Sequence, residues 1–312
     1  MIRRRIAFAA WSGLILLAVL LAACGAQSSV PAAPTDVIAV ESFLADITRN
    51  VAGDRLSVGS LIPEGLDPHT FDPTPQDVAR LAGSRASVIN GAGLETWLEP
   101  VLENAGDSLL IDASAGLEPR EPDHEDETEA EDEHGHEIDP HFWLDPISVV
   151  RYVENIRDGL SQIDPDGAND YTKNADAYIA RLRELDAWIR VQVETVPPER
   201  RLLVTNHESF GYFADRYGFK VVGAIIPSSS SSASPSAQRM AALVETIRSS
   251  GAPAIFLETG TNQQLANQLA AETRIAVVTG LQTHSLTLPD GSAGDYILMM
   301  RYNTELIVQA LK

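Results

Sequence analysis

Residues 168–196 read ANDYTKNADAYIARLRELDAWIRVQVETV. Apolar residues recur in this stretch at alternating spacings of four and three, from Tyr171 to Ile189, as they do on one face of an α-helix. At 1.5 Å per residue such a helix is roughly 40 Å long. Pro197 and Pro198 end it, because proline cannot continue a helix. A single helix of this length predicts a strut between two lobes.

Short β-rich runs alternate with helical runs on both sides of this stretch. The pattern predicts parallel sheets built from strand-helix-strand units. We expect strands at residues 37–40, 56–62, 86–90, 108–111, 202–205, 221–226, 254–257 and 275–278. We expect helices at residues 43–51, 76–81, 95–103, 210–217, 237–249, 262–271 and 296–311, and one that begins at Pro146.

The resulting fold class is α/β, with two similar parallel-sheet lobes, one long backbone helix and a cleft between the lobes. The expected divisions are a leader (1–23), a linker (24–35), an N-terminal lobe (36–164), a linking helix (165–198) and a C-terminal lobe (199–312).

The N-terminus carries an export signal. Three arginines precede a short apolar run, and Leu-Ala-Ala-Cys follows it at residues 21–24. Cys24 is the only cysteine, so the chain has no internal disulfide. The Leu-Ala-Ala-Cys stretch resembles a bacterial lipobox, which implies a lipid anchor on Cys24. The alternative is an ordinary secretory cleavage with a spare thiol.

The composition favours cations as ligands. The chain has 23 Lys and Arg against 44 Asp and Glu, for a formal net charge of -21. Nucleic acid is excluded as a partner, because phosphate binding requires a basic surface.

Four of the seven histidines lie in compact polar motifs, each close to the end of an expected strand or the start of an expected helix. They are His69 in Asp67-Pro68-His69, His141 in Asp139-Pro140-His141, His207 in Thr205-Asn206-His207-Glu208, and His284 in Thr283-His284-Ser285. Ligands of open α/β sheets bind at the carboxyl ends of strands, so these histidines should converge in the cleft. Neutral imidazole is a good zinc ligand. A lone loop histidine is more often a surface residue, but four in one arrangement favour a metal site.

Three segments resemble the signatures of zinc/manganese solute-binding lipoproteins of ABC importers: residues 65–75, 139–146 and 207–214. The resemblance extends over residues 36–312 and implies a two-lobed protein that binds one transition-metal ion and delivers it to a membrane permease. Matched motif by motif, His69, His141 and His207 take the positions of family ligands. The third position is histidine in zinc members and tends to be glutamate in manganese members, so the chain resembles the zinc type.

The fourth ligand position departs from the family, which usually has an aspartate there. Counting back from the last helix places His284 at this position, and Asp290 or Asp295 could supply a carboxylate instead. Four histidines would leave the charge of a divalent ion to nearby carboxylates, for which Asp67, Asp139, Glu208 and Glu258 are candidates.

The remaining histidines, His124, His134 and His136, lie in residues 121–139 beside eleven carboxylates. This insert has too few apolar residues to fold alone. It is either a solvated acidic loop or, as the resemblance implies, a weak zinc collector beside the cleft.

These observations predict an exported, lipid-anchored or periplasmic, monomeric protein that captures Zn²⁺ for an ABC permease. The alternatives are a manganese-binding homologue, an adhesin or zinc chaperone on the same fold, and a secreted zinc hydrolase in which Glu208 acts as the base. The hydrolase is the weaker hypothesis, because the chain contains no His-Glu-x-x-His motif, nucleophile elbow or phosphate loop.

Overall fold

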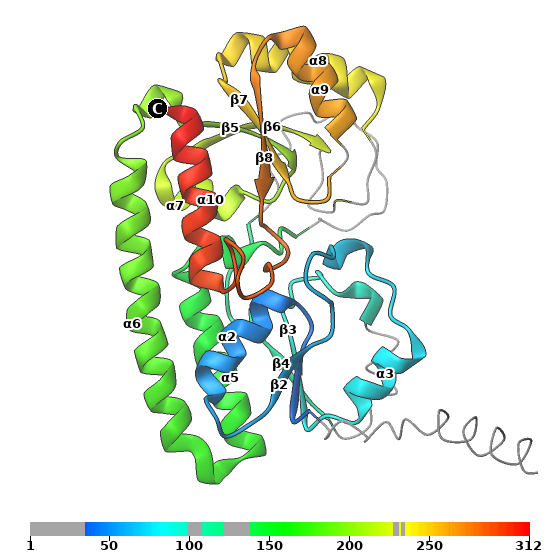
Figure 1. Ribbon diagram of the computed structural model, residues 1–312, viewed down its shortest axis with the longest axis vertical. Coiled ribbons are helices and arrows are strands. Elements are labelled where there is room, and N and C mark those ends of the chain that lie inside the picture. Colours follow the sequence, from blue (N-terminus) through cyan, green and yellow to red (C-terminus); the bar gives the residue numbers. More distant parts are fainter. Residues whose placement is uncertain (1–34, 99–107, 121–137, 227–230, 232–234, 262) are drawn as a thin grey trace, which may run out of the picture. The chain divides into compact units, whose positions relative to one another are not determined.

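The computed structural model describes residues 35–98, 108–120, 138–226, 231, 235–261 and 263–312. Within them lie two four-stranded sheets, in each of which all neighbouring strands pair in parallel. Figure 1 shows the two sheets in separate lobes, with one long helix, α6, running beside both. The expected α/β class with two parallel-sheet lobes is confirmed. Among the described residues, no helix is both long and apolar enough to cross a membrane.

The N-terminal sheet has the strand order β2-β1-β3-β4. Its strands are β1 (Val37–Ala39), β2 (Val58–Ser60), β3 (Ala86–Ile89) and β4 (Leu109–Asp112). The helices of this lobe are α2 (Ser42–Ala52), α3 (Pro75–Ala82) and α5 (Ser148–Ile163). A helix was expected at residues 95–103. The structure shows a short 3-10 turn there, η2 (Thr96–Leu98), and residues 99–103 lie outside the described part of the chain.

The C-terminal sheet repeats this arrangement with the order β6-β5-β7-β8. Its strands are β5 (Leu202–His207), β6 (Lys220–Ile226), β7 (Ala254–Glu258) and β8 (Ala276–Leu281). Its helices are α7 (Gly211–Tyr217), α8 (Ala237–Ser250), α9 (Gln263–Thr273) and α10 (Tyr296–Leu311). In both lobes the central strands are almost entirely buried, as is usual for parallel sheets that are covered by helices.

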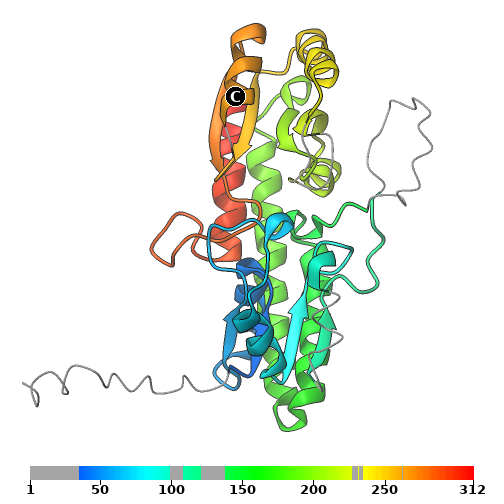
Figure 2. The ribbon, with the colours of Figure 1, turned by 90° about the vertical axis from the view of Figure 1, so that its right-hand side faces the viewer.

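Helix α6 (Ala168–Val193) is 26 residues long and ends three residues before the end expected from the sequence. The apolar residues that predicted the helix are buried: Tyr171, Ala175, Tyr178, Leu182, Leu185 and Ile189. They pack against α2 and α5 of the N-terminal lobe and against α10, which follows the C-terminal sheet. Figures 1 and 2 show α6 and α10 lying side by side along the chain's helical flank. One continuous apolar core therefore joins the long helix to both lobes.

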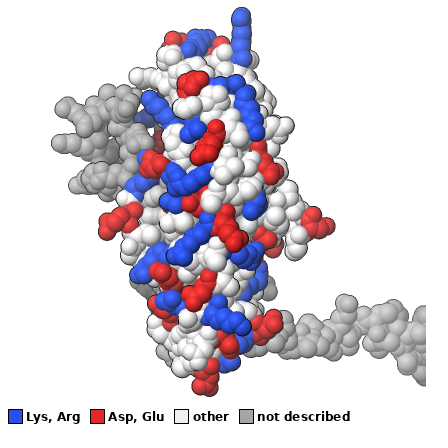
Figure 3. Space-filling model, turned by 90° about the vertical axis from the view of Figure 1, so that its left-hand side faces the viewer, with Lys and Arg blue, Asp and Glu red and all other residues white. Residues whose placement is uncertain are grey.

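The flank that α6 forms carries charges of both signs. In Figure 3, Lys and Arg side chains alternate with Asp and Glu over this face. Ion pairs at α6 include Arg190 with Asp186 at 3.3 Å and Arg216 of α7 with Asp186 at 2.7 Å. The face shown therefore has no extended basic surface of the kind that binds phosphate backbones.

Two glutamates are buried together beside the carboxyl end of the N-terminal sheet. Glu41 is 1% exposed and Glu95 is 6% exposed. Both oxygens of Glu95 accept backbone N–H groups, from Asn90 and Gly91. Burial, together with repulsion from Glu95, raises the pKa of Glu41 well above its ordinary value, and burial raises the pKa of Glu95 to about 7. A buried carboxyl pair of this kind holds a proton that two exposed carboxylates would release.

We therefore expect the contribution of this pair to the stability of the metal-free protein to fall as the pH rises from about 5 to 8. At these two carboxyls the folded state binds more protons than the unfolded state over this range, so their contribution to the free energy of unfolding falls by up to about 1.4 kcal/mol per pH unit for each such proton. Glu41→Gln preserves the size of the side chain but cannot ionise, so the stability of this variant should depend less on pH. Urea denaturation in the presence of a chelator at several pH values measures this. An exposed replacement, Glu305→Gln, is the control, and equal slopes for all three proteins would contradict the prediction.

Candidate metal centre

Each of the four histidines comes from a different loop or strand end. His69 lies in the 3-10 turn η1 (Pro68–Thr70), and His141 directly precedes the turn η3 (Phe142–Leu144). His207 is the last residue of β5, and His284 follows β8 in the loop that leads to α10. Two therefore come from the N-terminal lobe and two from the C-terminal lobe. Parallel strands bring their carboxyl ends to one edge of each sheet, and the two edges face each other here.

The four imidazoles meet at a single point. One ring nitrogen from each lies within 4.8 Å of the corresponding nitrogen of every other. The Nε2 atom of His141 lies 3.4 Å from that of His69, 3.3 Å from that of His284 and 3.2 Å from that of His207. Zinc bound to imidazole at 2.0–2.1 Å in a tetrahedron needs ligand nitrogens about 3.3–3.4 Å apart. The three separations match the edges of that tetrahedron.

The centre is buried and favours uncharged imidazole at two positions. His141 and His207 are 0% exposed, and His284 is 8% exposed. Burial, and then the positive charges that His284 and His207 can carry, lower the pKa of His69 to about 3. Burial likewise lowers the pKa of His141 well below its ordinary value. At neutral pH these two rings therefore present lone pairs that a metal ion can accept.

A single carboxylate orients both C-terminal-lobe histidines. Glu258, at the end of β7, has its Oε1 3.0 Å from Nδ1 of His207 and its Oε2 3.3 Å from Nδ1 of His284. Burial alone would raise the pKa of Glu258, but the neighbouring charges of His207 and His284 and their hydrogen bonds bring it well below its ordinary value. Burial would lower the pKa of His284, and Glu258 instead raises it. The carboxylate accepts both Nδ1–H groups, which leaves both Nε2 atoms directed at the shared point.

His141 has its own carboxylate. Oδ1 of Asp139 accepts from Nδ1 of His141 at 2.7 Å and from its backbone N–H at 3.0 Å. Burial raises the pKa of Asp139 to about 7, although the His141 backbone and the Arg120 guanidinium act to lower it. The buried carboxylates of Asp139 and Glu258 together touch three of the four imidazoles.

Asp67 behaves differently, although it begins an Asp-Pro-His tripeptide just as Asp139 does. Its Oδ1 accepts from the backbone N–H of His69 at 2.9 Å and caps the turn η1, and its Oδ2 accepts from the hydroxyl of Ser231. The described contacts of Asp67 therefore hold the loop of His69 in place rather than its ring.

Two residues that the sequence analysis did not assign to the site, Trp143 and Arg120, support it. Nε1 of Trp143 donates to the carbonyl of Thr283 at 2.6 Å, so this buried N-terminal-lobe indole positions the loop that carries His284. Arg120 lies 3.9 Å from Asp139 and 2.6 Å from Asp215 of α7, and ties the two lobes together behind His141. The two partners of each contact lie far apart in the sequence, so a local motif does not show that they meet.

The other candidate residues lie outside the cluster. Asp290 is in an exposed turn, and Asp295 is the N-cap of α10, where its side chain accepts from the N–H of Leu298 at 2.7 Å. Within the described residues, the one group of possible metal ligands contains His284 and neither aspartate, and Glu208 is not in it. Residues Cys24, His124, His134 and His136 lie outside the part of the chain that the structure describes.

Two α/β lobes, a long helix beside both and a buried four-histidine centre between them define a metal-binding solute-binding protein. Residues 37–310 match the family model described as zinc-uptake complex component A, periplasmic, and the chain belongs to this family. It is therefore the substrate-binding component of a metal ABC importer and not an enzyme, and the hydrolase hypothesis is wrong.

The relatives include proteins named for manganese and for zinc. The manganese-binding lipoprotein MntA of Halalkalibacterium halodurans is 33% identical over 301 residues, which cover 96% of each chain. The zinc-binding lipoprotein AdcA of Streptococcus pneumoniae is 33% identical over 306 residues, which cover 94% of this chain and 59% of AdcA.

Two solved structures share the fold. The manganese-bound periplasmic metal-binding protein of Candidatus Liberibacter asiaticus superposes with a TM-score of 0.77 at 29% identity, covering 88% of this chain and 99% of that one. The periplasmic zinc-binding protein TroA of Treponema pallidum gives a TM-score of 0.77 at 28% identity, with coverage of 88% and 98%.

Proposed function

We propose that this protein captures Zn²⁺ outside the cytoplasm and delivers it to its ABC permease, with His69, His141, His207 and His284 as the four ligands. The observation that carries the proposal is the all-imidazole cluster with nitrogen separations of 3.2–3.4 Å around His141. Tetrahedral nitrogen sites suit zinc, whereas manganese favours six oxygen ligands. Glu258 supplies a buried negative charge beside the ligands, and Asp139 would supply a second when the bound ion favours its ionised form, so that together they would balance the charge of the ion.

Manganese is the second candidate, because several relatives, including MntA and the PsaA proteins of streptococci, are named for manganese. Most protein sites bind Zn²⁺ more tightly than Mn²⁺, so a competition is informative only between variants. We expect metal-free protein incubated with equal concentrations of Zn²⁺ and Mn²⁺ to retain close to one zinc per chain, as measured by mass spectrometry of the bound metal, and His207→Glu to retain less zinc, because an oxygen ligand should reduce the preference for zinc. Slower manganese uptake with normal zinc uptake in cells that lack the protein would favour the second candidate.

We further propose that Cys24 carries lipid and that the protein is a monomer tethered at the outer face of the cytoplasmic membrane. The lipobox-like Leu-Ala-Ala-Cys supports this, as does the description of MntA, PsaA and AdcA as lipoproteins. Two or more acyl chains anchor durably, and tethering raises the concentration of carrier near its permease.

We expect the unmodified protein in the membrane fraction and Cys24→Ser released from it, with slower zinc uptake by cells that carry the variant in zinc-poor medium. Fractionation and zinc uptake measure the two effects. Unmodified protein found wholly soluble would contradict the anchor. Normal zinc uptake in cells that lack the protein would favour an adhesin or zinc chaperone instead.

A further inference from the structure

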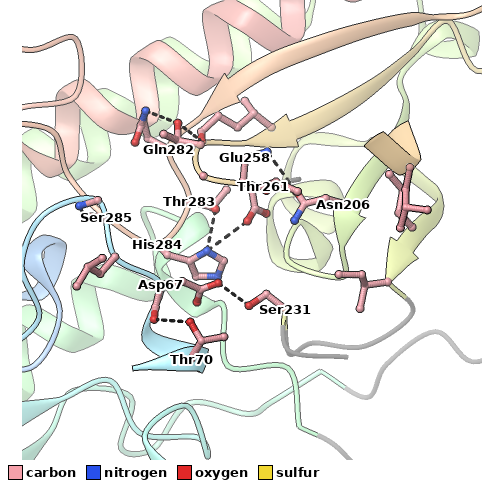
Figure 4. Close-up of a pocket in the computed structure, with 18 residues that line it drawn as sticks. Asp67, Thr70, Asn206, Ser231, Glu258, Thr261, Gln282, Thr283, His284 and Ser285 are labelled. Atoms are coloured by element: carbon pink, nitrogen blue, oxygen red, sulfur yellow. Dashed lines mark hydrogen bonds and ion pairs between the residues drawn. The ribbon is translucent and has the colours of Figure 1, made fainter. Parts of the chain in front are cut away.

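A cavity of about 460 Å³ lies beside the metal centre. Its wall is formed by both lobes, with Gly65, Leu66 and Asp67 on the N-terminal side and Glu258, Gly260 and His284 among those on the C-terminal side. Leu66 is 48% exposed, and Gly260 is exposed as well, so the cavity opens to solvent there. Figure 4 shows the imidazole of His284 at the cavity, with Asp67 and Glu258 beside it. The cavity therefore leads from solvent to one of the four histidines.

Of the four histidines, only His284 lines the cavity. His141 and His207 have no exposed surface, whereas His284 forms part of the cavity wall. His69 is partly exposed but does not line the cavity. An ion that enters through the cavity consequently reaches His284 before the fully buried His141 and His207.

The two carboxylates of the cavity wall are placed for different tasks. Glu258 has both oxygens bonded to imidazoles, and its Oε1 also accepts from Ser209 at 3.0 Å. Asp67 is not among the residues whose ligand atoms converge at the centre, yet it faces the cavity close to His284. A carboxylate in a cleft with low-dielectric walls attracts cations and raises their rate of association.

We propose that this cavity is the route by which the metal ion reaches and leaves the centre, and that Asp67 is the carboxylate that draws the incoming ion to His284. The inference rests on the proposed metal centre and adds to it a path and a residue that acts before coordination. Asp67 would thereby set the rate of loading, while the histidines set the strength of the final complex.

The test is the kinetics of zinc binding to metal-free full-length protein, followed by stopped flow with a chromophoric zinc chelator. Asp67→Asn keeps an oxygen that can accept the His69 N–H but removes the charge. We expect its association rate to fall about tenfold and to depend less on ionic strength than that of the unmodified protein, because salt screens steering by a charge. Thr261→Phe, which narrows the cavity without changing its charge, should also slow association. Asp290→Asn, in an exposed turn that does not line the cavity, should leave the rate unchanged.

Two outcomes would overturn the inference. Association rates of Asp67→Asn and Thr261→Phe equal to that of the unmodified protein would show that the ion uses another route. An unchanged association rate with strongly accelerated dissociation for Asp67→Asn would show that Asp67 stabilises the bound complex and does not guide the incoming ion. Failure of the unmodified protein to bind zinc would instead overturn the proposed function, and this inference with it.

Discussion

Replacement of His284 by alanine is expected to weaken zinc binding by more than about 100-fold, which exceeds the loss that follows removal of an outer partner of a metal ligand. The variant loses one of four nitrogens that converge on the same point, and the remaining three leave one tetrahedral position open. Isothermal titration with a competing chelator measures the change in affinity. The absorption spectrum of the cobalt-substituted protein reports the change in coordination independently.

Asp290→Ala and Asp295→Ala are matched controls, because the family resemblance makes these two aspartates the alternative source of the fourth ligand. Neither contacts the cluster, so zinc affinity should stay within a few fold of that of the unmodified protein. Asp295→Ala removes the N-cap of α10 and should instead cost about 1 kcal/mol of stability. If an aspartate variant lost more affinity than His284→Ala, a carboxylate would have to replace His284 in the ligand set.

Glu258→Gln is expected to have the next largest effect, a loss of about 10–100-fold in zinc affinity. One glutamine oxygen can accept from only one of the two Nδ1–H groups that Glu258 now contacts, at 3.0 Å on His207 and 3.3 Å on His284. The amide NH₂ group then faces the other ring nitrogen, which favours the wrong tautomer of that imidazole. The substitution also removes a buried negative charge beside the ion.

Glu305→Gln, on the exposed side of α10, is the control for the loss of one carboxylate without contact to the site. Its zinc affinity should equal that of the unmodified protein. Thermal denaturation of the metal-free forms separates affinity from folding. A Glu258→Gln variant that folds normally and binds zinc with unchanged affinity would show that His207 and His284 do not need this carboxylate for their orientation.

The architecture follows from patterns that can be read in the sequence. The spacing of Tyr171 to Ile189 predicts α6 because side chains at positions three and four apart share one helix face, whatever that face packs against. The alternation of strands and helices likewise predicts two parallel sheets. The helix expected at residues 95–103 is described only in part, and that part is the short turn η2.

The convergence of the four histidines was predictable as well, because strand ends meet at one edge of a parallel sheet. The local sequence could not distinguish the roles of the aspartates in the two Asp-Pro-His tripeptides. Asp139 contacts the ring of His141, whereas the equivalent Asp67 contacts only the backbone of His69 and the hydroxyl of Ser231. Their surroundings, and not the tripeptide, decide which role each aspartate takes.

The sequence by itself determined the two-lobed α/β fold, the long helix and the set of histidines, since each depends on a local period or on the end of a strand. Only the tertiary structure decided that Glu258 bridges His207 and His284, that Arg120 lies beside Asp139, and that the cluster includes His284 and not Asp295. The physical reason is distance. A hydrogen bond or a metal ligand must be placed to within a few tenths of an ångström, and for residues that lie this far apart in the chain that precision comes only from how the lobes and loops pack.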